Sequence, residues 1–264
     1  MQKKVNFENS RGQTLAGVLH IPDNPVQGKS LPMFPAVIIC HGFLSNKDTR
    51  SRTNFAEALA VQGFAALRFD FANSGDSEGS PENIRVSEEA QDVISAIDFL
   101  EKTKGIDPER IGVTGSSLGG MASLLAASED TRIKAIVAVS PVCDFRSTVW
   151  DAGNNDNLEE WKSQGFAYRT NAKGERFRIS YAFVEDGLSQ DVFSAARKIR
   201  CPVLVIHGDR DQQVPVMQSR KLMQNLKPHD VLEVIEGGDH WYSRPGWKEK
   251  RQALAIEWFR KWLR

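Results

Sequence analysis

The chain has 264 residues, of which 41% are hydrophobic and 26% charged, a balance typical of a globular protein with a buried core. Its 34 Lys and Arg residues equal its 34 Asp and Glu residues, so no net field would attract nucleic acid or an anionic membrane surface. The N-terminus lacks the apolar stretch of a signal peptide, and no later run is long enough to span a bilayer. We therefore expect a cytoplasmic protein that acts on a small molecule, with a homodimer left open.

The predicted elements begin with an antiparallel hairpin, residues 3–7 and 14–21, around the turn at Arg11-Gly12. After it, apolar strand-like runs alternate with segments of helical periodicity. The predicted strands are 35–40, 64–69, 110–114, 133–139, 203–207 and 231–235; the predicted helices are 54–62, 86–100, 118–128, 216–226 and 248–263. This alternation is typical of βαβ units, and it predicts an α/β fold with a mostly parallel sheet and helices on both faces.

One segment, residues 144–188, interrupts the alternation. It is rich in charge, glycine and asparagine, yet it carries eight aromatic residues. A structureless loop of this length would be unusual in a compact domain, so we expect a small cap inserted into a single domain that covers residues 1–264. Trp150, Trp161 and Tyr168 in this segment, with Trp241 near the C-terminus, are candidate substrate contacts, although the cap aromatics could equally form a core of their own.

The strongest local pattern is Gly-x-Ser-x-Gly, at the junction between predicted strand 110–114 and predicted helix 118–128. A serine on a sharp strand-to-helix turn has a strained backbone, which is tolerated when the residues two before and two after it are glycine. Gly115 and Gly119 flank Ser117 in this way, and the start of a helix favours developing negative charge. The pattern predicts Ser117 as a nucleophile, the alternative being an ordinary glycine-rich turn.

A nucleophilic serine needs a base within hydrogen-bond reach. His240 lies in a glycine-containing loop after the last predicted strand, and loops at the carboxyl ends of the strands converge on one face of such a sheet. The other histidines are His20, His41, His207 and His229. Of these, His41 is the alternative. It is less favoured, because the glycine after it suggests that the backbone at His41, rather than its imidazole ring, has the functional role. We expect His240 to be the base.

The orienting carboxylate should follow a strand on the same face, and residues 203–215 offer Asp209 and Asp211, with Asp144 after the preceding strand as a third candidate. The elbow, then His-Gly-Asp-x-Asp-x-x-Val-Pro, then Gly-Gly-Asp-His, resembles the α/β-hydrolase superfamily in the order serine, acid, histidine. The resemblance covers nearly the whole chain outside the insertion. It implies that Asp211 is the acid and that Asp209 shapes the turn.

Two backbone N–H groups are expected to stabilise the oxyanion: that of Leu118, directly after the nucleophile, and that of Phe43, which the resemblance assigns through the His-Gly-x turn at His41-Gly42-Phe43. The loop from Asp70 to Gly79 resembles a superfamily loop that supports this turn, so we expect Asp70 and Asp76 to be structural.

Cofactors are not expected. No clustered metal-ligand pattern occurs, and Cys40, Cys143 and Cys201 lack a CxxC partner, which indicates reduced, packed thiols.

The resemblance is nearest to small bacterial carboxylesterases similar to feruloyl (cinnamoyl) esterases, which carry a cap at this place. It implies hydrolysis of hydroxycinnamoyl or short-chain acyl esters through an acyl-enzyme. Acylaminoacyl or prolyl-type peptidases share the motifs, but usually with a large N-terminal domain. A thioesterase or acyltransferase would differ only in acyl donor or acceptor. A ligand-binding protein on a retired hydrolase scaffold would be expected to lack one of the three residues.

Overall fold

An eight-stranded, mostly parallel sheet organises the chain, of which the computed structural model describes residues 1–23, 33–148 and 158–264. Its strand order is β1-β2-β4-β3-β5-β6-β9-β10. The strands are β1 (Gln2–Glu8), β2 (Thr14–His20), β3 (Phe34–Cys40), β4 (Ala65–Phe69), β5 (Ile106–Ser116), β6 (Ile133–Val139), β9 (Val203–Gly208) and β10 (Val231–Ile235). Within this sheet, β1 with β2 and β2 with β4 pair antiparallel and the other neighbours are parallel, so the carboxyl ends of β3, β4, β5, β6, β9 and β10 lie at one edge.

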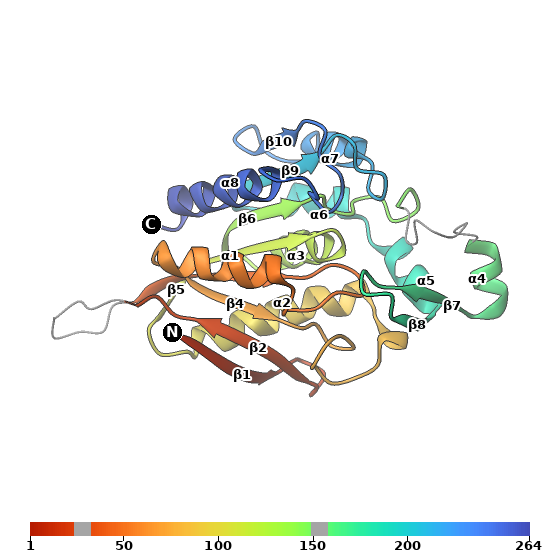
Figure 1. Cartoon of the computed structure of the whole chain (residues 1–264), viewed down its shortest axis with the longest axis horizontal. Helices are drawn as coiled ribbons and strands as arrows, with labels where there is room; N and C mark the ends of the chain where they lie inside the picture. Colours follow the sequence, from red (N-terminus) through yellow and green to blue (C-terminus); the bar gives the residue numbers. More distant parts are fainter. Residues whose placement is uncertain (24–32, 149–157) are drawn as a thin grey trace.

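Helices cover both faces of the sheet (Figure 1). On one face lie α2 (Val86–Glu101), α3 (Leu118–Glu129), α6 (Val192–Lys198) and α7 (Val216–Met223); on the other lie α1 (Arg50–Val61) and α8 (Trp247–Trp262). Each face has its own hydrophobic core. Gly112 lets α8 approach the sheet closely, because a Cβ atom there would lie 2.7 Å from Cε1 of Phe259. The sheet edge at the carboxyl ends of the strands remains available for a site.

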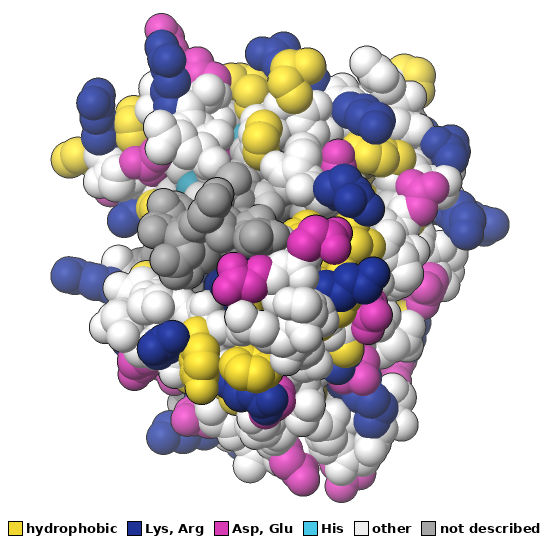
Figure 2. All heavy atoms as spheres, turned by 90° about the vertical axis from the view of Figure 1, so that its right-hand side faces the viewer, with side chains coloured by type: hydrophobic (Ala, Val, Ile, Leu, Met, Phe, Trp, Pro, Cys, Tyr) yellow, Lys and Arg dark blue, Asp and Glu magenta, His cyan; other side chains and the backbone are white. Residues whose placement is uncertain are grey.

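The segment between β6 and β9 contains a separate two-stranded sheet. Its elements are α4 (Leu158–Gln164), β7 (Phe166–Thr170), β8 (Arg176–Ser180) and α5 (Ala182–Ser189). Phe183 joins it to the domain by stacking on Phe43 with ring centroids 4.7 Å apart, and β8 lies beside the short 3-10 helix η1 (Pro81–Asn83). Figure 1 shows these elements gathered at the end of the molecule away from both termini, and Figure 2 shows basic and acidic side chains interspersed over that end. The predicted span 144–188 includes residues 149–157, which lie outside the described part, as does Trp150.

The fold class expected from the sequence is confirmed: a mostly parallel sheet, helices on both faces and an N-terminal hairpin. The differences lie at element ends. α1 begins at Arg50 rather than 54, and α7 ends at Met223 rather than 226. Within the described residues, no helix combines the length and apolarity needed to cross a membrane.

Candidate active site

Ser117 stands alone between strand β5, which ends at Ser116, and helix α3, which begins at Leu118. Its backbone has φ 56° and ψ −119°, a conformation that is strained for any residue with a side chain. The flanking glycines are required sterically: a Cβ atom on Gly115 would lie 2.1 Å from the carbonyl oxygen of Gly119, and one on Gly119 would lie 2.2 Å from that of His41. Ser117 therefore lies on a tight turn at the start of a helix, and the close packing around Gly115 and Gly119 holds its strained backbone in place.

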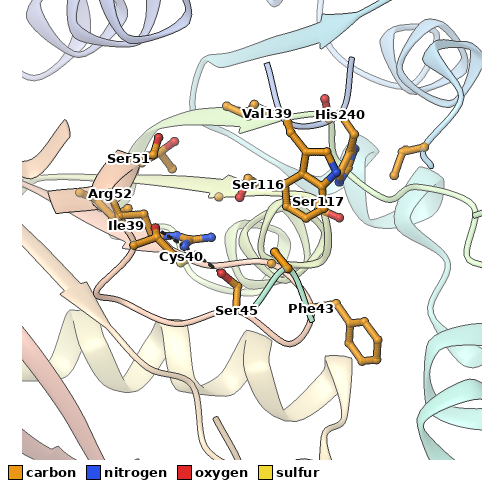
Figure 3. A pocket seen from close by; sticks show the side chains of 18 of the residues that line it. Ile39, Cys40, Phe43, Ser45, Ser51, Arg52, Ser116, Ser117, Val139 and His240 are labelled. Carbon is orange, nitrogen blue, oxygen red and sulfur yellow. Dashed lines mark hydrogen bonds between the residues drawn. The ribbon is translucent and has the colours of Figure 1, made fainter. Parts of the chain in front are cut away.

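His240 and Asp211 meet at the same edge of the sheet, from the loops that follow β10 and β9. Nδ1 of His240 lies 2.7 Å from Oδ2 of Asp211, so the Nδ1–H donates to the carboxylate. This bond leaves Nε2 of His240 to act as an acceptor. His240 and Ser117 line the same cavity and lie together on one side of it (Figure 3).

Asp211 is buried, and burial alone would raise its pKa. Hydrogen bonds from His207 and His240, together with the backbone N–H of Val214, reverse that effect and hold the pKa of Asp211 well below its usual range. The His207 ring lies beneath the loop, with Nε2 2.8 Å from the carbonyl oxygen of Val214 and Nδ1 2.6 Å from Oγ of Ser219. His207 is thus a buried support of the acid loop.

The other two acid candidates have different partners. Oδ1 of Asp209 accepts a hydrogen bond from the N–H of Gly237 at 2.7 Å, which ties the loop after β9 to the loop that carries His240. The backbone N–H of Asp144 donates to Gln218, and its side chain accepts the N–H of Arg146 at 3.2 Å. Of the three aspartates, Asp211 is the one bonded to His240.

The turn after β3 lies directly against the elbow. A Cβ atom on Gly42 would lie 3.1 Å from the carbonyl oxygen of Ser116 and 3.3 Å from Cβ of Ser117, so only a small residue fits there. Gly42 and Phe43 line the cavity beside Ser117. Leu118 directly follows Ser117, and the turn that carries Phe43 lies against the elbow, so both expected oxyanion donors belong to segments next to the nucleophile.

Both ring nitrogens of His41 form hydrogen bonds to backbone groups of neighbouring turns. It is buried, its Nδ1–H donates to the carbonyl oxygen of Gly42 at 2.9 Å, and its Nε2 accepts the N–H of Phe71 at 3.1 Å. Burial lowers its pKa to about 4, which keeps the ring neutral. Both ring nitrogens are occupied in holding the turn, so the geometry does not support His41 as the base.

Asp70 also supports the loop that follows β3 and carries Phe43. Its carboxylate accepts the backbone N–H of Lys47 at 2.6 Å, the ammonium group of Lys47 at 2.9 Å and the N–H of Asp76 at 2.9 Å. Gly75 is needed for this packing, because a Cβ atom there would lie 2.2 Å from Oδ2 of Asp70. Asp70 therefore couples the loop after β4 to the segment that carries Phe43, as a structural group.

The cavity has a volume of about 500 Å³, and Figure 3 shows part of its lining. Trp241 lines it, next to His240. Trp161 does not: it is buried in the insertion, its indole N–H donates to the carbonyl oxygen of Ile179 at 3.1 Å, and Arg169 lies 4.2 Å over its ring. Tyr168 is exposed outside the cavity, so the structure supports a substrate contact for neither Trp161 nor Tyr168.

The three cysteines are free and buried. Burial raises the pKa of Cys40 and of Cys201 to about 12 and raises that of Cys143 as well. At neutral pH these thiols are protonated and packed, which is the environment of inert cysteine.

Two models of known protein families match the chain, each over more than half of its length. The model described as the prolyl oligopeptidase family matches residues 86–264, and the model described as PET hydrolase-like matches residues 12–152. The chain belongs to these families of α/β-hydrolases. The first match covers the elbow and the loops of Asp211 and His240; the second covers the turn at Phe43 and the elbow.

Individual relatives of these α/β-hydrolases are more distant. An Escherichia coli protein described as an uncharacterized 31.7 kDa protein in the traX-finO intergenic region is 28% identical, over 87% of this chain and 91% of its own length. The Mus musculus palmitoyl-protein thioesterase ABHD10, mitochondrial, is 28% identical, over 78% of this chain and 69% of its own length. The solved structure of Est1E from Butyrivibrio proteoclasticus with ferulic acid bound is 24% identical, with a TM-score of 0.79 over 97% of this chain and 99% of that one. This last likeness shows the shared fold.

Sequence reasoning missed the part of this α/β-hydrolase cavity that lies between α1 and α8. Arg52 and Arg251 line it, and Thr170, Asn171 and Ala172 from the insertion line the same cavity. Their positions carry no local motif, because each comes from a helix or hairpin whose neighbour in space is distant in sequence. Only the three-dimensional packing of α1 against α8 reveals them.

Proposed function

We propose that the chain is a serine carboxylic ester hydrolase that uses Ser117, His240 and Asp211 through an acyl-enzyme. The observation that carries the proposal is the pairing of a strained elbow serine with a histidine whose Nδ1–H is held by Asp211 at 2.7 Å, both lining one cavity. A serine so placed needs only the free Nε2 of that histidine as proton acceptor.

In the proposed reaction, the hydroxyl of Ser117 attacks the ester carbonyl while Nε2 of His240 takes its proton. The N–H groups of Phe43 and Leu118 stabilise the oxyanion, and the dipole of α3 contributes in the same direction. His240 then donates the proton to the departing alkoxide, which leaves as the alcohol. Water, deprotonated by His240, attacks the acyl-enzyme; the bond between the acyl carbon and Oγ of Ser117 breaks, and His240 returns the proton to Ser117 as the carboxylic acid leaves. No cofactor takes part in these steps.

For the acyl group, we propose hydroxycinnamoyl or short-chain acids. The likeness to the ferulic acid complex of Est1E supports the first choice at the level of fold. Phe43 lines the cavity together with Ser117 and supplies aromatic surface that suits a planar phenolic group. The cavity volume of about 500 Å³ is within the range that small-molecule sites have.

A fluorophosphonate probe and an ester panel test the proposal together. The probe should label the wild type and the Ser116→Ala control but not Ser117→Ala. The wild type should hydrolyse some member of a p-nitrophenyl series from acetate to octanoate, with methyl ferulate added to rank the hydroxycinnamoyl group. Absence of both labelling and turnover in folded wild-type protein would refute the assignment.

A thioesterase is the second candidate, and the relationship to the palmitoyl-protein thioesterase ABHD10 favours it. Amide hydrolysis is a further candidate activity, because the chain also matches the prolyl oligopeptidase family model. An ester, a thioester and an anilide of one common acyl group separate the three activities. The bond with the highest kcat/KM, compared after correction for its uncatalysed rate, identifies the class.

A further inference from the structure

The cavity continues beyond Ser117 into a cationic end between helices α1 and α8. Ser51 and Arg52 of α1 and Arg251 of α8 line this end, and Lys248 of α8 also lines the cavity. In Figure 3, Ser51 and Arg52 lie on the opposite side of the cavity from His240. A substrate that fills the cavity therefore reaches from the nucleophile to these cations.

Arg52 is anchored by one end of its guanidinium group. Its Nη1 donates to Oγ of Ser45 at 3.0 Å, to the carbonyl oxygen of Asn46 at 2.9 Å and to Oγ1 of Thr49 at 2.6 Å. Across residues 1–23, 33–148 and 158–264, its Nε and Nη2 have no hydrogen-bond partner. These two nitrogens form the edge that binds a carboxylate in bidentate fashion.

Arg251 lies near Arg52 and is also only partly satisfied. Its Nη2 donates to Oγ of Ser51 at 3.0 Å, and its guanidinium group lies 5.0 Å over the ring of Tyr242. Among the described side chains, no carboxylate lies within 4.0 Å of either arginine. Burial, and then the charge of Arg251, lower the pKa of Arg52 to about 10, while burial lowers that of Arg251.

Two guanidinium groups held away from water without a counterion raise the free energy of the folded protein, and an anionic ligand bound between them would lower it. The place of His240 indicates which part of an ester would bring the anion. The oxygen of the leaving alcohol must lie near His240, because it receives a proton from that ring. The end of the cavity away from His240 therefore receives the acyl group.

We propose that Arg52 and Arg251 bind a carboxylate at the far end of the acyl group, so that, of the short-chain acyl esters, half-esters of dicarboxylic acids are preferred. This inference rests on the proposed function and names its substrate class. The free edge of Arg52 supplies the bidentate contact, and Arg251 supplies the second cation. The hydrolytic step itself is unchanged.

Two esters that differ only in the terminal group test it: mono-p-nitrophenyl adipate and p-nitrophenyl hexanoate. The wild type should show kcat/KM about tenfold or more higher for the adipate half-ester, the gain expected of charge-assisted hydrogen bonds in a recessed site. Most of the gain should lie in KM, because the arginines contact a part of the substrate that does not react. Equal values, or a preference for hexanoate, would overturn the proposal.

Arginine variants identify the groups responsible. Arg52→Met and Arg251→Met should each reduce the ratio of kcat/KM for the adipate half-ester to kcat/KM for the hexanoate ester, and Arg52→Lys should retain part of that ratio. Arg220→Met, an exposed residue of α7 outside the cavity, is the matched control. A preference that survives in the double variant Arg52→Met/Arg251→Met would contradict the assignment.

Binding to Ser117→Ala separates this inference from the proposed function. By calorimetry, adipate should bind this variant more tightly than hexanoate, and the difference should disappear when Arg251→Met is added. If the wild-type protein hydrolyses neither ester but this arginine-dependent binding is found, the anion site is supported and the proposed ester hydrolysis is refuted. If the esters are hydrolysed but adipate and hexanoate bind equally, the anion site is refuted and the proposed function remains.

Discussion

Asp209 and Asp211 are two residues apart on one loop, yet their carboxylates have different partners. Asp211 binds Nδ1 of His240 at 2.7 Å, whereas Asp209 binds the backbone N–H of Gly237 at 2.7 Å. The first contact orients an imidazole, and the second fixes the course of the loop that carries it. Substitution of each residue should therefore affect different properties.

Asp211→Asn should reduce kcat toward a p-nitrophenyl ester by about a thousandfold or more, because an amide NH₂ facing Nδ1 favours the wrong tautomer of His240. Asp209→Asn should keep kcat within a few fold and lower the free energy of unfolding by about 1 kcal/mol, the cost of replacing a charged acceptor with a neutral one. Steady-state kinetics and urea unfolding measure both. Equal losses of kcat in the two variants would contradict the separation of roles.

The second prediction concerns the elbow. Gly119→Ala would place a Cβ atom 2.2 Å from the carbonyl oxygen of His41, so the backbone must move apart. We expect a loss of about 3 kcal/mol or more of stability, and a loss of labelling of Ser117 by a fluorophosphonate probe in whatever protein still folds. The control is Gly174→Ala, with φ 82° but open space around its Cβ; it should cost about 1 kcal/mol and leave labelling intact. Normal labelling of Gly119→Ala would show that the elbow tolerates a side chain.

What could be predicted from the sequence depended on how local the cause was. The elbow at Ser117 could be anticipated because the strand, the two glycines and the helix are contiguous, and the sterics of the turn are contained in them. The N-terminal hairpin and the βαβ alternation could be predicted in the same way, because they depend on the spacing of apolar residues and on which residues form turns. Local causes thus account for most of the fold and for the candidate nucleophile.

The parts that sequence reasoning missed depend on packing between distant segments. Arg52 and Arg251 meet because α1 and α8 cover the same face of the sheet. Trp161 was a candidate substrate contact, but an aromatic residue in an insertion looks the same in sequence whether it packs inward or lines a cavity. Its hydrogen bond to Ile179 exists only once the insertion folds on itself.

The third prediction concerns the support of the turn that carries Phe43. Asp70→Asn would remove the buried counterion of the Lys47 ammonium group and leave only the exposed carboxylates of Asp48 and Asp76, which should cost about 3 kcal/mol or more of stability. Because the turn would loosen, kcat should also fall by about tenfold or more. Asp76→Asn is the matched control: its side chain also contacts Lys47 but is 75% exposed, so both effects should be small. Similar kinetics for the two variants would show that the turn does not depend on Asp70.

The fourth prediction concerns Glu89, which is buried on α2 and whose Oε2 has no hydrogen-bond partner among the residues that the structure describes. Burial, with the nearby Asp92 and Asp186, raises its pKa well above the ordinary value, so the folded state keeps a proton that the unfolded state releases above about pH 4.5. Glu89 therefore costs stability as the pH rises from there. Glu89→Gln should raise the free energy of unfolding by about 2 kcal/mol at pH 8 and leave it unchanged near pH 4. Glu185→Gln, an exposed change on α5, controls for lost charge, and a pH-independent effect of Glu89→Gln in denaturant titrations would disprove this account.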